Sequence, residues 1–209
     1  MNLVIDIGNT AFKAAVFKSD EMISSMQWDE TDNTRISEWL EAYPEIKRSI
    51  ISSVRKDDAG YTVSLEKAGI RVMMLDERTP LPLTNRYRSA STLGRDRIAA
   101  AVGANSRFPG QNLLVIDAGT AITIDFVSAA NEYLGGNISP GLSMRFRSLH
   151  EFTDNLPLVA QASTKELLGN NTESAIRAGV QHGIIFEMDE YINRQKKRYP
   201  DLQVILTGG

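Results

Sequence analysis

The stretch LVIDIGNT at residues 3–10 is the most informative part of the sequence, because a close copy of it, LVIDAGT, recurs at residues 114–120. In each copy a short apolar run leads to an aspartate, then to a turn with glycine and threonine, and then to a second apolar run. An apolar strand, a glycine turn and another apolar strand predict a β-hairpin. Since the two copies lie half a chain apart, the sequence predicts two related halves, each built around one such hairpin.

Segments typical of strands and helices alternate around the hairpins. We expect strands over residues 50–54, 71–75 and 202–206, and helices over residues 57–68, 96–104 and 172–197. Apolar residues recur every four positions in the last helix and predict one apolar face: Ile176, Val180, Ile184, Met188 and Ile192. The alternation is typical of an α/β fold. We expect an N-terminal lobe over residues 1–110 and a C-terminal lobe over residues 111–209.

Two glycine-rich segments lie in the C-terminal half. The first, GGNISPGL at residues 135–142, is expected to form a loop that leads into a helix near Leu142. The second, TGG at residues 207–209, follows the last apolar strand directly, so we expect the C-terminal lobe to be truncated there.

Composition excludes several kinds of chemistry. The chain has 209 residues, 42% of them hydrophobic and 23% charged, which is ordinary for a globular enzyme. With no cysteine, disulfides, thiolate metal sites and a cysteine nucleophile are excluded. The two histidines, His150 and His182, have no partner pattern and are interpreted as structural.

Charge and hydropathy bear on partners and compartment. The net charge of −3 does not indicate binding to nucleic acid, because proteins that bind nucleic acid usually carry a basic surface. No apolar run has the length needed to span a bilayer, and the N-terminus lacks the features of a signal peptide. We therefore expect neither a nucleic-acid nor a membrane partner, and a cytoplasmic location.

The paired hairpins favour phosphate binding. Turns of small residues expose backbone N–H groups that bind phosphate oxygens, and a threonine hydroxyl adds a donor. The aspartates Asp6 and Asp117 are suited to holding a cation that offsets phosphate charge. One such turn would be unremarkable, but two aligned copies favour a grip on a polyphosphate. Lys13, on the second strand of the first hairpin, is either a phosphate ligand or a solvated strand lysine.

The segment GRDR at residues 94–97 precedes the helix of small residues. Asp96, flanked by two arginines, is either a general base for a substrate hydroxyl or the N-cap of that helix. The arginines are suited to an anionic substrate.

Together these motifs resemble the type III pantothenate kinases, a family of the actin-like and hexokinase-like ATPase superfamily. The resemblance runs in order through DIGNT (6–10), GRDR (94–97), DAGT (117–120), GGNISPGL (135–142) and TGG (207–209). It implies two duplicated actin-like, ribonuclease H-like lobes, each a mixed β-sheet flanked by helices. It also implies ATP-dependent phosphorylation of pantothenate to 4'-phosphopantothenate, the first step of coenzyme A biosynthesis.

The resemblance assigns roles to particular residues. Asp96 is expected to be the catalytic base, Asp117 to bind a monovalent cation, K⁺ or NH₄⁺, and Asp6 to bind Mg²⁺. The expected ATP-binding residues are Asp6, Ile7, Gly8, Asn9, Thr10, Ala11, Phe12, Lys13 and Thr120. The expected pantothenate-binding residues are Tyr87, Gly94, Arg95, Asp96, Arg97 and Thr172.

The family works as a homodimer, which the resemblance therefore implies here. The expected contact is made by the apolar face of the helix from Thr172 and by the small residues Ala99, Ala100, Ala101 and Gly103. Two alternatives to the kinase assignment stay open. One is a sugar or short-chain acid kinase of the same superfamily, and the other is a non-catalytic, nucleotide-sensing transcriptional accessory factor.

Overall fold

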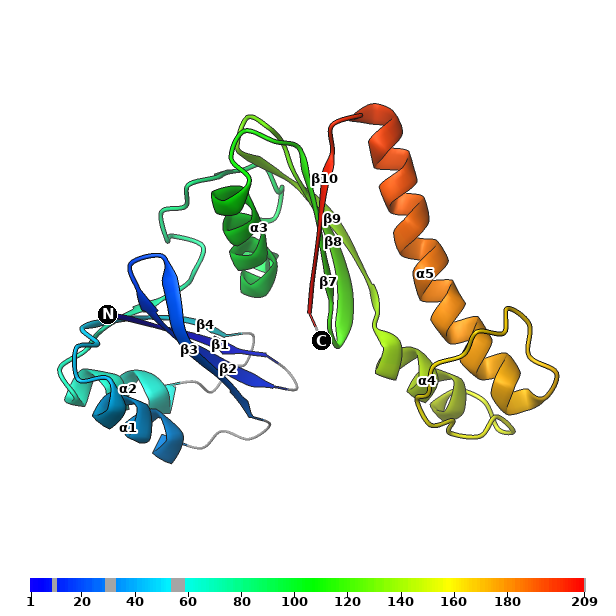
Figure 1. The fold of residues 1–209 in the computed structure, drawn as a ribbon, viewed down its shortest axis with the longest axis horizontal. Coiled ribbons are helices and arrows are strands. Elements are labelled where there is room, and N and C mark those ends of the chain that lie inside the picture. Colours follow the sequence, from blue (N-terminus) through cyan, green and yellow to red (C-terminus); the bar gives the residue numbers. More distant parts are fainter. Residues whose placement is uncertain (9–10, 29–32, 54–58, 209) are drawn as a thin grey trace. The chain divides into compact units, whose positions relative to one another are not determined.

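The computed structural model describes residues 1–8, 11–28, 33–53 and 59–208 (Figure 1). It divides into two compact units. Residues 1–80 and 89–99 form the first unit, and residues 81–88 and 100–209 form the second. Each unit contains a five-stranded mixed sheet with helices, which confirms the predicted α/β fold class.

The sheet of the first unit has the strand order β3-β2-β1-β4-β5. Its strands are β1 (Asn2–Ile7), β2 (Phe12–Lys18), β3 (Glu21–Trp28), β4 (Arg48–Ser53) and β5 (Arg71–Met74). Strands β1 and β2 pair antiparallel from Asn2↔Phe17 to Ile7↔Phe12, which confirms the first predicted hairpin. Strand β4 pairs parallel to both β1 and β5, so the carboxyl ends of these three strands share one edge.

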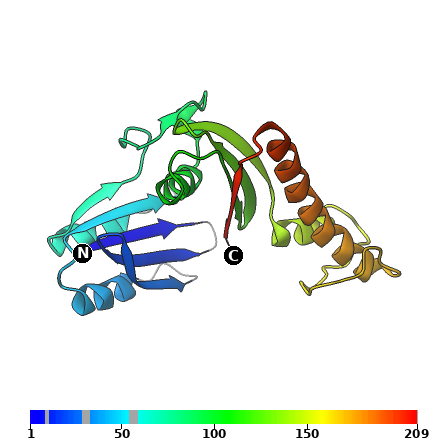
Figure 2. The ribbon, with the colours of Figure 1, turned by 45° about the horizontal axis from the view of Figure 1, so that its top comes forward.

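Two helices cover one face of this sheet, α1 (Asn33–Ala42) and α2 (Ala59–Lys67), as Figures 1 and 2 show. Alternate residues of β1 are buried on that face, and they pack with residues of both helices in one core: Leu3, Ile5, Ile7, Ile36, Trp39, Tyr61 and Leu65. Because side chains alternate along a strand, Asp6 lies on the opposite face. Neither β3 nor α1 was predicted from the sequence.

The sheet of the second unit has the order β10-β7-β8-β9-β6 and repeats the same plan. Its strands are β6 (Thr84–Asn85), β7 (Leu113–Ala118), β8 (Ala121–Val127), β9 (Glu132–Pro140) and β10 (Gln203–Gly208). Strands β7 and β8 form the second predicted hairpin, and β10 runs parallel to β7. In both units the aspartate strand is therefore flanked by an antiparallel and a parallel neighbour.

Strand β9 corrects one prediction, because residues 135–140, expected in a loop, lie in a strand. Glycine composition is a poor guide here, since these glycines permit close approach to neighbouring groups. A Cβ on Gly136 would lie 2.1 Å from the Ile124 carbonyl oxygen. Gly135 has φ +108°, and a Cβ there would lie 3.2 Å from the Tyr87 ring.

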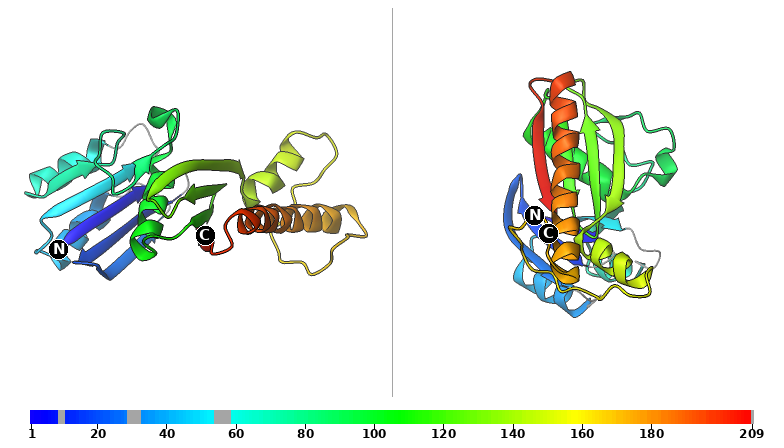
Figure 3. Two further views of the ribbon diagram at one scale, coloured as in Figure 1. Left: turned by 90° about the horizontal axis from the view of Figure 1, so that it is seen from above. Right: turned by 90° about the vertical axis from the view of Figure 1, so that its right-hand side faces the viewer.

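In the second unit, one long connection between β9 and β10 carries two helices, α4 (Leu142–Glu151) and α5 (Thr172–Arg198). Figure 3 shows α5 lying along the sheet with α4 beside its N-terminal half. Asn171 caps α5 by accepting from the Ser174 N–H at 2.9 Å, and the Ser174 side chain completes a capping box. The start of α4 at Leu142 and the extent of α5 agree with the predictions.

The apolar face of α5 is used inside the unit. Ile176, Val180 and Ile184 are buried in one core with residues of β7 and β8. Our expectation that this face makes the subunit contact is therefore wrong, and Ala101 of the small-residue segment is fully buried as well.

The remaining elements are a short 3-10 helix and a helix whose residues are divided between the two units. A 3-10 helix, η1 (Ala90–Thr92), precedes α3 (Arg95–Arg107), which contributes residues to both units. Both histidines contact backbone carbonyls, His150 that of Leu156 at 2.8 Å and His182 that of Glu166 at 2.9 Å. Within the described ranges, no helix has the length and apolar character to cross a membrane.

Candidate functional site

Asp6 stands at the carboxyl end of β1, on the sheet face without α1 and α2. Its partners in register are Lys13 on β2 and Ser52 on β4. Residues directly opposite each other in neighbouring strands project from the same face. The sheet register therefore surrounds Asp6 with an ammonium group on one side and a hydroxyl group on the other.

Burial and a second carboxylate raise the pKa of Asp6. Burial is the largest cause, because it disfavours the charged form. The Ser52 hydroxyl lowers the pKa, the negative charge of Asp96 raises it, and the Lys13 charge lowers it. The net shift is upward. The structure thus brings together two predicted site carboxylates, Asp6 and Asp96, within electrostatic reach in the first unit.

Asp96 lies in the first turn of α3, one residue after the helix begins at Arg95. Its Oδ1 accepts a hydrogen bond from the Arg97 N–H at 2.8 Å. The carboxylate thus pairs with one of the backbone N–H groups that have no partner within the helix, although Asp96 lies inside the helix and not at the N-cap position. A Cβ on Gly94 would lie 2.4 Å from Asp96 Oδ1. Glycine at 94 therefore leaves the room that this carboxylate occupies.

The two arginines of the motif lie in the first turn of α3. Arg95 Nη1 donates to the Ser53 carbonyl at 3.3 Å, which ties α3 to the carboxyl end of β4. Arg97 is only 4% exposed. That both side chains line a substrate pocket stays a prediction. Arg95 also has a positioning contact with β4, the strand that carries Ser52.

The turn of the first hairpin is only partly described. Asn9 and Thr10, both predicted ATP ligands, lie outside the described residues. Gly8 donates its N–H to the Ala11 carbonyl at 3.0 Å. Ile7 and Phe12 are buried core residues, at 1% and 2% exposure. Their side chains serve the core, so only their backbone is suited to contacting a phosphate.

Asp117 occupies the matching position in the second unit, at the carboxyl end of β7. Its partners in register are Thr123 on β8 and Thr207 on β10. A hydroxyl residue thus lies on the parallel neighbour in both units, but no lysine faces Asp117. A Cβ on Gly208, at φ +102°, would lie 2.6 Å from Asp117 Oδ1, so β10 passes close to the carboxylate.

The remaining predicted residues are spread over the second unit. Thr120 is exposed in the β7–β8 turn. Tyr87 lies against Gly135 and Tyr133 of β9, with 6.1 Å between the two tyrosine ring centroids. This position is at the far end of β8 from the Thr120 turn, because Gly135 pairs with Phe126. Thr172 is the exposed first residue of α5.

The Asp6 carboxylate is suited to sharing a metal ion with a ligand. In the described ranges, no group of three or more acidic or histidine side chains could hold a metal ion. Mg²⁺ is commonly held by one or two carboxylates together with phosphate oxygens and water. Asp6 fits that pattern as a single carboxylate, and phosphate oxygens and water would complete the coordination.

Solved structures show what class of fold this is. A structure from Sinorhizobium meliloti, described as a candidate 2-dehydro-3-deoxygalactonokinase, has a TM-score of 0.59 at 12% identity, covering 100% of this chain and 94% of that one. A candidate Baf family transcriptional activator from Campylobacter jejuni has a TM-score of 0.59 at 22% identity, covering 99% and 83%. At these identities the likeness defines the fold alone, which is the actin-like ATPase fold.

Sequence comparison defines the family. Residues 2–194 match the family model for type III pantothenate kinase. A type III pantothenate kinase of Bacteroides fragilis is 45% identical over 212 residues, covering 100% of this chain and 86% of the relative. That of Flavobacterium johnsoniae is 38% identical over 210 residues with the same coverage. The chain belongs to the type III pantothenate kinase family.

We predict that Asp6→Asn stabilises the protein at neutral pH. The raised pKa means that the folded state binds a proton at Asp6 more tightly than the unfolded state, so ionisation of Asp6 opposes folding. The neutral amide should raise the melting temperature by about 1–4 °C at about pH 7. That advantage should shrink as pH falls through the pKa of Asp6, since the wild-type carboxyl then becomes neutral too.

Thermal denaturation across this pH range measures the effect. Asp20→Asn, in the exposed β2–β3 turn, is the matched control and should leave the melting temperature unchanged. A lower melting temperature for Asp6→Asn at neutral pH would mean that contacts of the carboxylate outweigh the cost of its burial.

Proposed function

We propose that this protein transfers the γ-phosphoryl group of ATP to the hydroxyl of pantothenate and forms 4'-phosphopantothenate, the first step of coenzyme A biosynthesis. The proposal rests on one observation above the others. Asp96 is fixed at the start of α3, where its charge acts on Asp6 at the end of β1, in a chain 45% identical to a type III pantothenate kinase.

In this proposal, Asp96 is the catalytic base. The pantothenate hydroxyl oxygen forms a bond to the γ-phosphorus, its proton passes to the Asp96 carboxylate, and the bond from phosphorus to the ADP oxygen breaks. The Arg97 N–H holds the carboxylate in place, and the absence of a side chain at Gly94 leaves room for it. Lys13, opposite Asp6, contributes a positive charge to the phosphate side. Tyr87, Gly94, Arg95, Arg97 and Thr172 remain proposed substrate residues.

Asp6 is proposed to hold Mg²⁺, which offsets phosphate charge when bound. A half-buried carboxylate of raised pKa gains from a nearby cation, because the cation favours its charged form. Asp117 is proposed to hold a monovalent cation. Its neighbours in register supply neutral oxygens rather than a second carboxylate, which suits K⁺ or NH₄⁺.

Two other functions are weaker. A sugar or short-chain acid kinase shares the fold, and one solved neighbour is described as a sugar-acid kinase, but at 12% identity. A regulatory role shares the fold with the Campylobacter jejuni protein, but at 22% identity. A regulator that carries out no reaction also has no need of a catalytic base such as the Asp96 carboxylate. The cytoplasmic location stays a prediction.

A homodimer is supported by exposed apolar side chains on α5. Ile185 and Phe186 are 44% and 56% exposed, and Leu167 and Leu168 on the preceding connection are 60% and 84% exposed. The His182 ring stacks on Phe186 and contacts the Glu166 carbonyl, which brings this connection to the same part of α5. Apolar patches of this kind mark protein interfaces. We propose that this surface, rather than the buried face of α5, makes the subunit contact.

The first prediction from this proposal is that Asp96→Asn abolishes turnover without loss of ATP binding. Asparagine keeps an oxygen for the Arg97 N–H but cannot take up the proton, and loss of a general base costs about 10²–10⁴ in rate. The measurement is ATP-dependent phosphorylation, followed by mass spectrometry, of pantothenate and a panel of sugars and short-chain acids. If the wild-type protein phosphorylates a sugar or short-chain acid but not pantothenate, the proposed substrate is wrong. If Asp96→Asn keeps wild-type turnover, Asp96 is a structural residue and not the catalytic base.

We also predict that activity depends on K⁺ or NH₄⁺ and that Na⁺ is a poor substitute. Asp117→Asn should blunt this dependence while the melting temperature stays near that of the wild type. Initial rates at constant ionic strength, with each chloride salt in turn, measure the dependence. Equal rates in Na⁺ and K⁺ would remove the monovalent-ion role from Asp117.

The subunit contact predicts that Phe186→Asp gives monomers. A buried carboxylate without a partner is costly at an apolar interface, so the dimer should dissociate. Light scattering coupled to size-exclusion chromatography measures the mass. Met22→Asp on β3 is the matched control, because Met22 has the same 56% exposure in the other unit. A dimeric Phe186→Asp variant would place the contact elsewhere.

A further inference from the structure

The turn that carries Thr120 contacts the backbone just after the end of β9. Gly141 donates its N–H to the Thr120 carbonyl at 3.0 Å. A Cβ on Gly141 would lie 2.2 Å from the Gly119 carbonyl oxygen and 2.4 Å from that of Thr120. The two segments are therefore in direct backbone contact, and a displacement of residues 139–141 would displace the turn.

Arg145, one turn into α4, holds these residues in place. Its Nε donates to the Pro140 carbonyl at 2.7 Å, and its Nη2 donates to Ser139 Oγ at 3.4 Å. Its backbone N–H donates to the Gly141 carbonyl at 3.0 Å. One residue thus contacts each of the three residues that lead into the turn contact.

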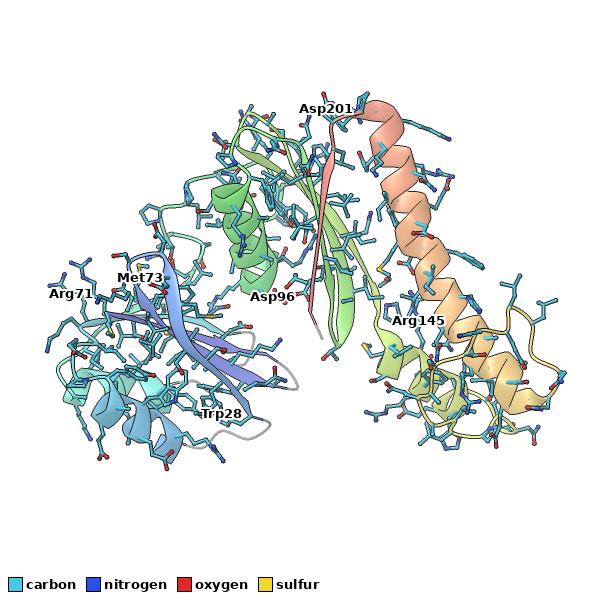
Figure 4. The ribbon with its side chains drawn as sticks, in the orientation of Figure 1. Trp28, Arg71, Met73, Asp96, Arg145 and Asp201 are labelled. Carbon is cyan, nitrogen blue, oxygen red and sulfur yellow. The ribbon has the colours of Figure 1, made fainter. Side chains whose placement is uncertain are left out.

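Glu187 of α5 fixes the guanidinium of Arg145. Arg145 Nη2 forms an ion pair and a hydrogen bond with Glu187 Oε2, and their side chains are 21% and 24% exposed. Burial acts to raise the pKa of Glu187, but the Ser139 hydroxyl and Arg145 outweigh it, so the pKa is lowered. The pair is therefore charged at neutral pH. Figure 4 shows Arg145 between α4 and α5.

A second ion pair on the same helix gives a contrast. Arg147 pairs with Glu151 at 2.9 Å, but both side chains lie on α4 and are 69% and 48% exposed. Exposed pairs within one helix contribute little. Arg145 differs from Arg147 because it joins three elements, the end of β9, α4 and α5, around one half-buried charge.

We infer that Arg145, oriented by Glu187, is a positioning residue that sets the geometry of the Thr120 turn for the phosphates of ATP. The inference rests on the proposed function, together with the expectation from the sequence that Thr120 contacts ATP. Arg145 itself acts through Pro140 and Gly141. A planar guanidinium with donors in fixed directions can serve the Pro140 carbonyl, Ser139 and Glu187 at once, whereas a lysine ammonium on a flexible stem cannot hold that arrangement.

The test compares four full-length proteins: wild type, Arg145→Lys, Glu187→Gln and Arg147→Lys. Binding of Mg·ATP is measured by calorimetry, and KM for ATP and for pantothenate are measured at a temperature well below every melting point. Arg145→Lys should weaken Mg·ATP binding and raise KM for ATP about tenfold, because a turn that is no longer held in place must be ordered when ATP binds. KM for pantothenate should change much less. Glu187→Gln should have a smaller effect in the same direction, and Arg147→Lys none.

The double variant Arg145→Lys with Glu187→Gln should bind Mg·ATP no more weakly than Arg145→Lys alone, since Glu187 acts through Arg145. Additive losses would separate the two residues and overturn that order of action. Equal Mg·ATP affinity in Arg145→Lys and Arg147→Lys would overturn the inference. If Arg145→Lys fails to fold, unchanged affinity in the folded Glu187→Gln variant would overturn it. Because calorimetry needs no turnover, Mg·ATP binding without pantothenate phosphorylation would count against the proposed reaction and leave the positioning role testable.

Discussion

The parallel pairing of a hairpin strand with a later strand determines where the side chains of each sheet lie. It joins β1 to β4 in the first unit and β7 to β10 in the second. Parallel strands end at the same edge, so each pairing places a hydroxyl residue beside the aspartate, Ser52 beside Asp6 and Thr207 beside Asp117. Parallel strands need long connections between them. These connections supply α1 in the first unit and α4 and α5 in the second, whose apolar faces bury the sheets.

The two copies of the hairpin keep the same plan but offer different chemistry. Lys13 faces Asp6 across the first hairpin, whereas Thr123 faces Asp117 across the second. The second turn is also a residue shorter, because Ala118 pairs with Ile122 while Ile7 pairs with Phe12. An aspartate with a lysine and a second carboxylate nearby favours a strongly charged ligand complex such as magnesium with phosphate. An aspartate among hydroxyl groups favours a weaker, exchangeable cation.

The sequence predicted those parts of the fold that leave a local or repeated signal. The hairpins were visible because the apolar runs and their turns recur, and α5 was visible because its apolar residues keep a helical period over many turns. Strand β9 was missed because Gly135 and Gly136 were taken as signs of a loop. They are needed in the strand for packing against Tyr87 and the Ile124 carbonyl, which are distant in the sequence. The use of the apolar face of α5 was also missed, since periodicity gives a buried face but not the surface that covers it.

The site was predictable to a similar extent. Asp6 and Asp96 could be singled out by their motifs, but their mutual electrostatic effect depends on Arg95 tying α3 to the end of β4. Ser52 had no signal of its own, because its importance comes from the register of β4 with β1. Arg145 and Glu187 lie 42 residues apart, and neither belongs to a motif. Residues that hold catalytic groups in place are set by tertiary contacts, so they are found in the structure and not in sequence patterns.

The raised pKa of Asp6 shows why such supporting contacts matter. A half-buried carboxylate near a second carboxylate is unfavourable for the folded protein alone, and only the partial compensation from Ser52 and Lys13 reduces that cost. In the proposed function, a cation held at Asp6 would favour the charged form of the carboxylate and offset that cost. Binding therefore relieves an electrostatic conflict present in the free protein. The contact of Arg95 with the Ser53 carbonyl ties α3 to the end of β4, so α3 is not free to move away and relieve that conflict instead.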